Sequence, residues 1–489
     1  MGERHTLNPT ARIAKNSLVQ MIGGLANKVL AVLLVIYAAR QLGTAGFGTY
    51  AFLLTLLNIF YLITDFGLGT LTTRDVAREP AEEGRYLGNV LFLRFALALI
   101  AAAGMIATAA VVQPAPAIVK LAALLALSLF FPGGVDTCSA IFYAHQRMEL
   151  PAGVGVIATM LRVGISLGAL AAGAGLTALL VIYTAAAAVQ FVLLLILLGM
   201  HMSFRFSLTW TFWKYLLGQA FPLALANLFS VVYFRVDTIM LAALAGQEAV
   251  GLYNAAFRLL EFTLMVPAYY VGAIFPVVSA SQAAHPQRFL LIYRRSFKYM
   301  LIAALPMAVG ASMLSPSLVD VLYGREYAAS VPVLAVLMWS LVFIAVNSFN
   351  APYLIAMGRQ RTVTLLTAFG MVLNIALNAW AIPRWGIMGA AWVTLAAEAV
   401  TILLYFAALA RPLALKFRML RHAVRPLAAV GVMALVLRFT LTWDLGFQVF
   451  AAACVYLAVL VFTGTFDVVD RELFARLRRP LTDRGGPLA

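Results

Sequence analysis

Lys28 and Arg162 are basic residues near the centres of two long apolar stretches, and neither has an acidic residue within one helical turn. A cation at the centre of a bilayer costs roughly 2.5–3.5 kcal/mol on insertion scales, so such residues persist where they have a use. We expect both side chains to face a cavity. The alternative is a structural ion pair with an acid on another helix.

Two further cations lie beside acids in apolar sequence. Arg258 and Glu261 are three residues apart, so on a helix they share a face, and a local ion pair and a cavity role stay equally open. Arg235 and Asp237 are two residues apart and point to different faces, and Arg235 could also lie near the outer membrane interface. Arg235 is therefore a weaker cavity candidate.

Arg94 and Arg438 are expected to have structural roles only. Arg94 lies seven residues into its predicted span and Arg438 lies near the end of another. A long arginine side chain in such a position extends its charged end to the headgroups. We expect both residues to do so.

Acidic side chains also occur within the predicted spans. They are Asp65, Asp136, Asp237, Glu261 and Glu398. A carboxylate in a low-dielectric site binds a proton or pairs with a cation, so such residues are candidates for coupling transport to an ion gradient. For this role we select Asp65, Asp237, Glu261 and Glu398, with helix capping as the alternative for Asp65.

Asparagine pairs recur at helical spacing. Asn347 and Asn350 share one helix face, and Asn374 and Asn378 share another. Their amides could meet sugar hydroxyls, but hydrogen bonding between helices is the favoured interpretation.

The elements that must position these residues are membrane helices. With 63% hydrophobic and only 11% charged residues, 489 residues lack the polar surface of a water-soluble protein. Because a spanning helix needs roughly 20 mostly apolar residues, the sequence predicts an all-α polytopic membrane protein with about 14 transmembrane helices. The predicted spans are 16–39, 48–69, 87–112, 117–144, 153–172, 176–200, 215–243, 249–283, 299–322, 332–357, 363–382, 387–410, 426–443 and 446–464.

The net charge of +16 orients the protein. With a cytoplasmic N-terminus, 25 of the 35 Lys and Arg residues fall in inner segments and four in outer segments. This is the positive-inside pattern, so we expect a multi-pass protein of the cytoplasmic membrane with both termini inside, and no nucleic-acid binding. Cys138 and Cys454 form no metal-ligand spacing, and neither a metal site nor a cofactor is expected.

An internal repeat divides the chain. Gly43, Gly48 and Tyr50 match Gly246, Gly251 and Tyr253 at a constant offset, and each GxxxxGxY lies between two spans, where glycine permits a tight reversal. The offset predicts two pseudo-symmetric six-helix lobes, 1–200 and 201–410, followed by two C-terminal helices and a cytoplasmic tail in 411–489. Breaks are expected at Pro132-Gly133-Gly134, Pro267, Pro276, Pro306 and Pro352.

Missing motifs narrow the function. No GxxxxGK[ST] occurs, so the chain has no P-loop for ATP. An integral membrane glycan polymerase or ligase would need acid, His or Arg groups on a sizeable outer loop, and the predicted outer loops are short and nearly uncharged. We therefore expect a transporter and not an enzyme.

The sequence resembles the polysaccharide-type flippases of the MOP superfamily, the Wzx-type translocators of O-antigen and exopolysaccharide repeat units. The strongest resemblance is RQLGTAGFGTY followed by DFGLG and a TRDVAR loop, with FRVDTIMLAALAGQEAVGLYNAAFRLLE and WGIMGAAWVT further on. It implies two lobes around a central cavity that opens alternately to either side of the membrane. The cargo would be a polyprenyl diphosphate-linked oligosaccharide that moves outward.

In this family Lys28, Arg162 and Arg258 would contact the diphosphate, with Arg235 a weaker candidate. The expected partners are the lipid-linked oligosaccharide, membrane lipids, a proton or sodium gradient and the glycan polymerase machinery. A MATE-like ion-coupled exporter of organic cations and a lipid II flippase are the alternatives, and an acidic cavity wall would favour the exporter.

Overall fold

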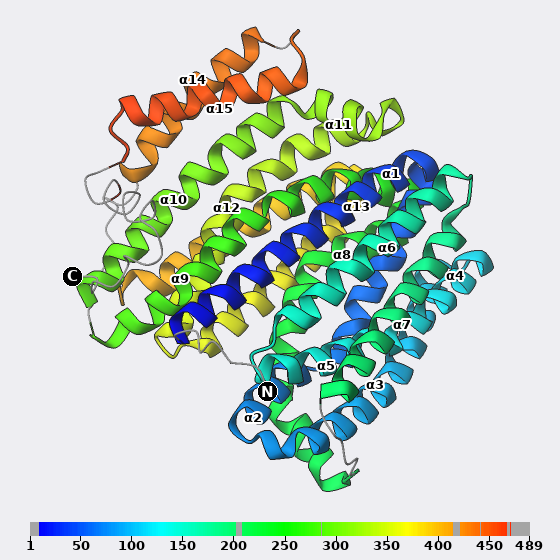
Figure 1. Ribbon diagram of the computed structural model, residues 1–489. Helices are drawn as coiled ribbons and strands as arrows, with labels where there is room; N and C mark the ends of the chain where they lie inside the picture. Colours follow the sequence, from blue (N-terminus) through cyan, green and yellow to red (C-terminus); the bar gives the residue numbers. More distant parts are fainter. Residues whose placement is uncertain are drawn as a thin grey trace. The chain divides into compact units, whose positions relative to one another are not determined.

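The computed structural model describes residues 9–201, 208–284, 286–413, 421–440, 442–466 and 470. Helices are the regular secondary structure of these residues, and no strand occurs among them (Figure 1). The elements are α1 Pro9–Asp65, α2 Leu68–Arg78, η1 Pro80–Glu82, α3 Glu83–Val112, α4 Pro116–Ala126, η2 Leu127–Phe130, α5 Pro132–Ala144, α6 Glu149–Ala171, α7 Leu176–His201, α8 Trp210–Thr263, α9 Met265–Ala284, α10 Pro286–Met313, α11 Ser315–Tyr323, η3 Arg325–Tyr327, α12 Ser330–Ala356, α13 Gln360–Ala410, α14 Arg421–Phe439 and α15 Leu445–Phe462.

Eleven helical segments of the described chain are long and apolar enough to cross a membrane. Three of them, Gly23–Arg78, Ala224–Gln282 and Gln360–Ala410, contain 56, 59 and 51 residues. A single crossing takes roughly 20 residues, so each of the three is long enough for two. The chain is therefore an all-α polytopic membrane protein.

Each of the three long segments bends at a glycine. Gly43 in α1 has φ 67°, Gly246 in α8 has φ 85° and Gly386 in α13 has φ 54°. These left-handed backbone angles are ones that residues with a Cβ rarely adopt. The prediction that the glycines of the two GxxxxGxY motifs permit a reversal is confirmed at Gly43 and Gly246.

The second glycines of the two motifs bring α1 and α8 into backbone contact. A Cβ on Gly48 would overlap the carbonyl oxygen of Gln247 and lie 2.9 Å from the amide nitrogen of Gly251. A Cβ on Gly251 would in turn overlap the carbonyl oxygen of Thr44 and lie 3.1 Å from the amide nitrogen of Gly48. The contact is thus reciprocal, as expected for two copies of one motif, and it requires glycine on both helices.

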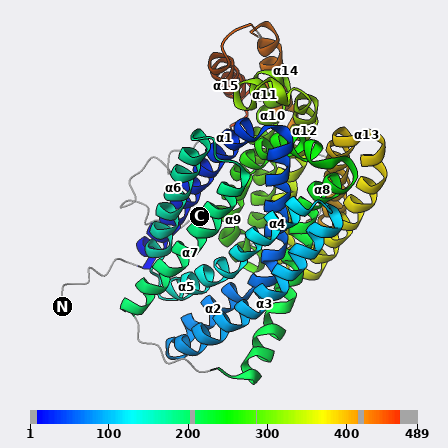
Figure 2. The same ribbon diagram turned by 90° about the vertical axis from the view of Figure 1, so that its right-hand side faces the viewer.

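The described chain forms two compact units. The first contains the residues up to Arg258 together with Leu322–Ser330 and Thr367–Val393, and the second contains Leu259–Val321, Val331–Leu366 and the remainder from Thr394. Within the first unit α1 packs against α3 and α6, and α6 packs against α7 (Figures 1 and 2). The predicted lobe boundaries at 200 and 410 stay a prediction.

Inside the first unit, Leu322–Ser330 contacts both glycine turns, which are the helix reversals at Gly43 and Gly246. The Arg40 Nε donates to the carbonyl of Leu322 at 2.8 Å, and the Tyr327 hydroxyl donates to the carbonyl of Ala39 at 2.9 Å. On the other turn, the Ser330 hydroxyl donates to the carbonyl of Leu252 at 2.7 Å. The segment Leu322–Ser330 is therefore hydrogen-bonded to α1 near Gly43 and to α8 near Gly246.

The predicted proline breaks differ among themselves. At Pro132-Gly133-Gly134 the helix is indeed interrupted, because α4 ends at Ala126, a 3₁₀ turn follows and α5 begins at Pro132. Near Pro267, α8 ends at Thr263 and α9 begins at Met265. By contrast, α9, α10 and α12 continue through Pro276, Pro306 and Pro352, so no helix ends at these three residues.

The second unit packs α10 against α9, α14 and α15. Lys298 on α10 is buried, and its Nζ lies 2.5 Å from Asp470, which also accepts from Arg295 at 3.0 Å. The Tyr456 hydroxyl of α15 donates to the carbonyl of Ile302 at 2.8 Å. Polar contacts thus tie the C-terminal part of the chain to α10.

Candidate functional site

Arg94 on α3 is a buried ion-pair partner, and not a headgroup contact as predicted. Its side chain is 2% exposed, and its Nη2 donates to Asp65 Oδ1 at 2.8 Å. Its Nη1 donates to the carbonyl of Gly133 at 2.7 Å. Asp65 is the last residue of α1 and Gly133 belongs to α5, so the partners of Arg94 come from other helices.

Two glycines make room for the Arg94 side chain. A Cβ on Gly69 would lie 3.3 Å from Arg94 Nη2, and a Cβ on Gly133 would lie 3.3 Å from Arg94 Cδ. Gly69 belongs to α2, and Gly133 lies in the interrupted stretch at the start of α5. The absence of a side chain at Gly69 and Gly133 therefore allows the Arg94 guanidinium to reach the carbonyl of Gly133.

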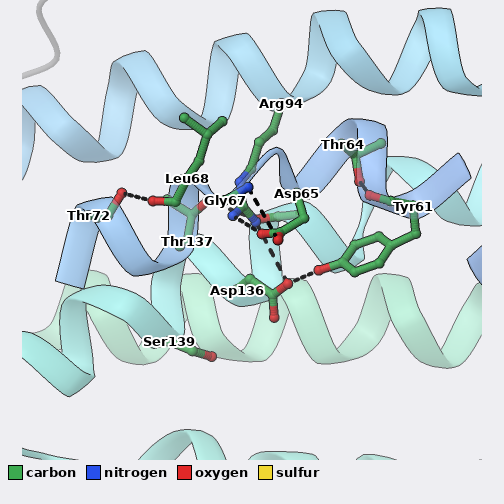
Figure 3. Close-up of polar contacts among 12 residues, drawn as sticks. Tyr61, Thr64, Asp65, Gly67, Leu68, Thr72, Arg94, Asp136, Thr137 and Ser139 are labelled. Carbon is green, nitrogen blue, oxygen red and sulfur yellow. Dashed lines mark hydrogen bonds and ion pairs between the residues drawn. The ribbon is translucent and has the colours of Figure 1, made fainter. Parts of the chain in front are cut away.

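Asp136 on α5 is the second carboxylate of this cluster. One of its oxygens accepts a hydrogen bond from the Tyr61 hydroxyl and lies 3.8 Å from Arg94 Nη1. In Figure 3 the other oxygen points away from Arg94 and Tyr61. The Asp136 side chain is 43% exposed, whereas that of Arg94 is 2% exposed. Asp136 therefore connects a buried ion pair to open space.

That open space is a cavity of about 180 Å³ between α5, α6 and α7. Arg162, a residue predicted to face a cavity, lies on its wall together with Asp136 and Tyr183. The guanidinium carbon of Arg162 lies 5.1 Å from the centre of the Tyr183 ring. Its Nε is buried and has no hydrogen-bond partner among the described residues.

Arg162 and Arg258 both interact electrostatically with Tyr50 in the first unit. The Tyr50 hydroxyl, from the first GxxxxGxY motif, lies within electrostatic range of both guanidinium groups and of Tyr183. Tyr50 itself is buried. Arg162 and Arg258, almost one hundred residues apart in sequence, thus both contribute to the electrostatic environment of Tyr50.

Lys28 is exposed on α1 and follows Asn27, which lies beside Gly155 of α6. A Cβ on Gly155 of α6 would lie 3.9 Å from the side-chain Nδ2 of Asn27. It would lie 3.7 Å from the side-chain Nε2 of Gln190, a residue of the cavity wall. The helix that carries Lys28 therefore passes beside the cavity. Arg235 is partly buried on α8.

Asp237 lies in a second polar cluster, on α8 and α13. The carboxylate is 3% exposed and accepts hydrogen bonds from the Tyr253 hydroxyl at 2.8 Å and from Asn378 Nδ2 at 3.0 Å. Asn378 also donates to Asn374 Oδ1 at 3.0 Å, and its own Oδ1 is buried without a donor among the described residues. The favoured interpretation of Asn374 and Asn378, hydrogen bonding between helices, is confirmed.

The other two predicted coupling residues belong to the second unit. Glu398 on α13 is 4% exposed and accepts from Asn347 Nδ2 of α12 at 2.8 Å, which is again a bond between helices. Glu261 is partly buried near the end of α8. In the described part of the chain no group of three His, Cys, Asp or Glu residues could hold a metal ion.

Sequence reasoning did not find the cavity or its partners Tyr61, Thr159, Tyr183 and Gln190. Each is a polar residue that is common in membrane helices, and the residues next to it in the sequence do not indicate a site. The interrupted helix at Pro132-Gly133-Gly134 was the available signal, because it pointed to a place where the backbone departs from regular packing.

Comparison with known proteins gives two family matches. The model of the polysaccharide biosynthesis protein family matches residues 13–282, more than half of the chain. A MatE model matches residues 222–380. The two matches overlap in α8 and α9.

Individual proteins of known name or structure are also similar to this chain. Agl15 of Haloferax volcanii, a probable low-salt glycan biosynthesis flippase, is 23% identical over 418 residues, which cover 83% of this chain and 85% of that protein. The lipid II flippase MurJ in an inward closed conformation has a TM-score of 0.75 at 14% identity, over 93% of this chain and 99% of that one. An inward-facing MATE transporter of the MOP superfamily has a TM-score of 0.65 at 14% identity, over 79% and 94%. At these identities the solved structures establish a shared fold.

Proposed function

Since this chain belongs to the polysaccharide biosynthesis protein family, a family of membrane transporters in the MOP superfamily and not of enzymes, we propose that it is a flippase for a lipid-linked glycan. Its cargo is a polyprenyl diphosphate-linked oligosaccharide, which it moves from the cytoplasmic to the outer leaflet. The observation that carries the proposal is the presence of Lys28 and Arg258 in membrane helices of the first unit, in a chain that aligns over 83% of its length with a probable glycan flippase.

The chemistry of the crossing explains why cations are needed. A diphosphate bears negative charge, and transfer of unpaired charge into a low-dielectric interior is strongly unfavourable. Lys28 and Arg258, with Arg235 as a weaker contributor, offset this charge along the passage, while the polyprenyl tail stays in lipid. Arg162 shares its cavity with the Asp136 carboxylate, so its attraction for a dianion is smaller.

Alternating access is the proposed mechanism. In it, the contacts at the glycine turns close the passage and separate when it opens. In the topology that the positive-inside pattern predicts, Gly43 and Gly246 lie at the outer end. There the Gly48–Gly251 contact and the bonds from Leu322–Ser330 close the outer side. To release cargo outward, these contacts separate.

The membrane topology completes the proposal. If each of the three segments that contain Gly43, Gly246 and Gly386 crosses twice, the eleven apolar segments provide fourteen crossings. Both termini are then cytoplasmic, in agreement with the distribution of Lys and Arg. The protein would reside in the cytoplasmic membrane, beside the machinery that polymerises the glycan.

For coupling to a proton or sodium gradient, Asp237 is the best placed of the four carboxylates. It is buried among hydroxyl and amide groups that offer oxygen atoms, and Asn378 Oδ1 has an unused acceptor capacity there. Asp65, by contrast, pairs with Arg94 at 2.8 Å. Its carboxylate therefore already has a cationic partner and is less available to a coupling ion.

The decisive experiment is lipid-pool analysis of a strain that lacks the protein. A flippase predicts accumulation of diphosphate-linked oligosaccharide on the cytoplasmic side and loss of surface glycan. Complementation with a Lys28→Ala, Arg258→Ala double variant should leave the defect in place, whereas Lys28→Arg, Arg258→Lys should restore much of the surface glycan. Fluorescence-detected size exclusion of tagged protein checks that all variants insert.

Other outcomes would select the alternatives. Altered drug sensitivity with normal surface glycan would contradict the proposal and favour a MATE-like exporter, for which the MatE match to residues 222–380 is the specific support. Accumulation of lipid II alone would favour a lipid II flippase, which has the same cationic chemistry with a different glycan.

A further inference from the structure

The cavity between α5, α6 and α7 has an unusual set of polar groups for a membrane protein interior. Its wall includes one carboxylate, one guanidinium, one primary amide, one hydroxyl and one aromatic ring, from Asp136, Arg162, Gln190, Thr159 and Tyr183. These groups come from three consecutive helices of the same unit. Small residues, including Ala186 and Ala187, form much of the remaining wall and leave the volume open.

The charge of this cavity does not suit the diphosphate. Asp136 and Arg162 give one negative and one positive charge, so the wall is close to neutral. A diphosphate placed here would bring its charge against the Asp136 carboxylate, and like charges at such distances repel. The ligand that fits is uncharged and carries several hydroxyl groups.

The donor and acceptor pattern suits a sugar ring. A carboxylate oxygen accepts from a sugar hydroxyl, while a guanidinium or an amide NH₂ donates to another, and an amide oxygen or a threonine hydroxyl serves a third. Hydrogen bonds that involve a charged partner are the stronger ones. An aromatic ring supplies an apolar surface for the C–H face of the sugar, as expected for a site with few, well-placed polar groups.

The polar groups are held in place before any ligand binds. The Tyr61 hydroxyl and Arg94 fix one oxygen of Asp136, and the second oxygen points away from them (Figure 3). The Tyr183 ring supports the Arg162 guanidinium at 5.1 Å, and the Arg162 Nε has no acceptor among the described residues. Such pre-organisation lowers the entropy cost of binding.

From these observations we infer that the cavity is a glycan subsite, which binds one neutral sugar ring of the lipid-linked oligosaccharide. The inference rests on the proposed function and deepens it, because it separates two recognition sites. Lys28 and Arg258 serve the diphosphate, and Arg162 with Asp136 serves the sugar. The buried Arg94–Asp65 pair positions Asp136 and does not touch the ligand.

The test compares two lipids on purified, detergent-solubilised protein by native mass spectrometry. The probes are polyprenyl diphosphate and the same lipid with one N-acetylhexosamine attached. The wild-type protein should bind the sugar-bearing lipid about tenfold more tightly, a difference that corresponds to about 1.4 kcal/mol. Free N-acetylhexosamine is a third probe, and a subsite for a lipid-linked sugar predicts that it binds far more weakly than the sugar-bearing lipid.

A matched pair of variants on α7 tests the location. Ala187→Phe places a ring in the cavity, while Ala185→Phe adds the same ring at an exposed position of the same helix outside the cavity wall. Ala187→Phe should abolish the tenfold preference and leave the affinity for polyprenyl diphosphate unchanged. Ala185→Phe should preserve both. Gln190→Ala, which removes polar atoms without filling space, should reduce the preference severalfold.

The outcomes separate this inference from the proposed function. If wild-type protein binds both lipids equally, or if Ala187→Phe keeps the preference, the glycan subsite is overturned and the flippase proposal stands. If neither lipid binds, or if the Lys28→Ala, Arg258→Ala variant binds polyprenyl diphosphate normally, the diphosphate site of the proposed function fails. Tight binding of the free sugar would identify a soluble saccharide as the ligand and also overturn the inference.

Discussion

Gly48 and Gly251 face one another where α1 and α8 cross, so closely that a Cβ on either residue would overlap a carbonyl oxygen of the other helix. The overlapped carbonyls belong to Thr44 and Gln247, which occupy the same position in the two motifs. Close backbone approach at small residues is a common way to join helices in a membrane, where the hydrophobic effect does not distinguish a neighbouring helix from lipid.

Replacing Gly48 by Ala should weaken this crossing. Backbone atoms cannot move aside as a flexible side chain does, and overpacking of this kind typically costs about 1–3 kcal/mol. We expect a lower thermal midpoint in detergent, measured by fluorescence-detected size exclusion, and the same direction for Gly251→Ala. Gly164→Ala is the control, because no atom lies within 4 Å of a Cβ at that α6 position. Equal midpoints for Gly48→Ala and Gly164→Ala would refute the close crossing.

Holding Leu322 against the glycine turn at Gly43 should stop transport. In a background with Cys138→Ala and Cys454→Ala, cysteines at Arg40 and Leu322 would be joined by a cleavable bifunctional thiol reagent, since the Arg40 side chain reaches the Leu322 carbonyl at 2.8 Å. We expect loss of surface glycan synthesis after joining and recovery after cleavage of the reagent. The same double-cysteine protein without reagent is the control. Full transport by the joined protein would mean that Leu322 does not separate from the glycine turn at Gly43 during transport.

The Arg94–Asp65 pair should matter for stability far more than a pair at the surface. Removing one member of a buried ion pair costs about 3–5 kcal/mol where no other partner is near. Asp136, 3.8 Å from Arg94, would compensate only part of the remaining charge. Asp65→Ala should therefore lower the thermal midpoint strongly. The matched control is Glu82→Ala, whose partner Arg85 lies at 2.9 Å with both side chains more than 30% exposed, where a pair contributes at most about 1 kcal/mol. Similar losses in both variants would argue against a buried pair.

Asp237→Asn should remove the dependence of transport on the coupling ion. The substitution keeps the shape of the side chain and its hydrogen bonding toward Tyr253, but it removes the charge that attracts a proton or sodium. The measurement is uptake of fluorescent lipid-linked glycan into proteoliposomes with an imposed proton or sodium gradient. Wild-type uptake should respond to one of the gradients, and the variant should respond to neither. If the variant keeps the wild-type response to the gradient, Asp237 is not the coupling residue. Glu79→Gln, at an exposed residue outside the helices, is the control for general effects of removing a carboxylate.

The sequence was sufficient for features that depend on local pattern. Long apolar stretches predicted the helices, and the glycines of GxxxxGxY predicted reversals at Gly43 and Gly246, because residues with a Cβ rarely adopt a left-handed backbone angle. The interruption at Pro132-Gly133-Gly134 could be predicted because proline lacks the N–H of a continuous helix and is favoured in its first turn. These features need no knowledge of distant neighbours.

The candidate site was predictable only in part, because charge pairing in a helical membrane protein is set by tertiary packing. Arg94 meets Asp65 and Asp136, which are 29 and 42 positions away on other helices, so its own neighbourhood pointed wrongly to the headgroups. Arg162 lies on a cavity wall, but its carboxylate neighbour Asp136 could not be paired with it from spacing. The shape of the cavity depends on three helices at once.

The buried Arg94–Asp65 pair has a consequence for biogenesis. Asp65 precedes Arg94 in the chain, so during synthesis the counter-ion emerges from the ribosome before the cation that needs it. An arginine that enters lipid alone meets a steep insertion barrier, whereas one that leaves the translocon as a hairpin with its carboxylate meets a lower one. The order of these two residues along the chain thus lets the first helices assemble as they are made.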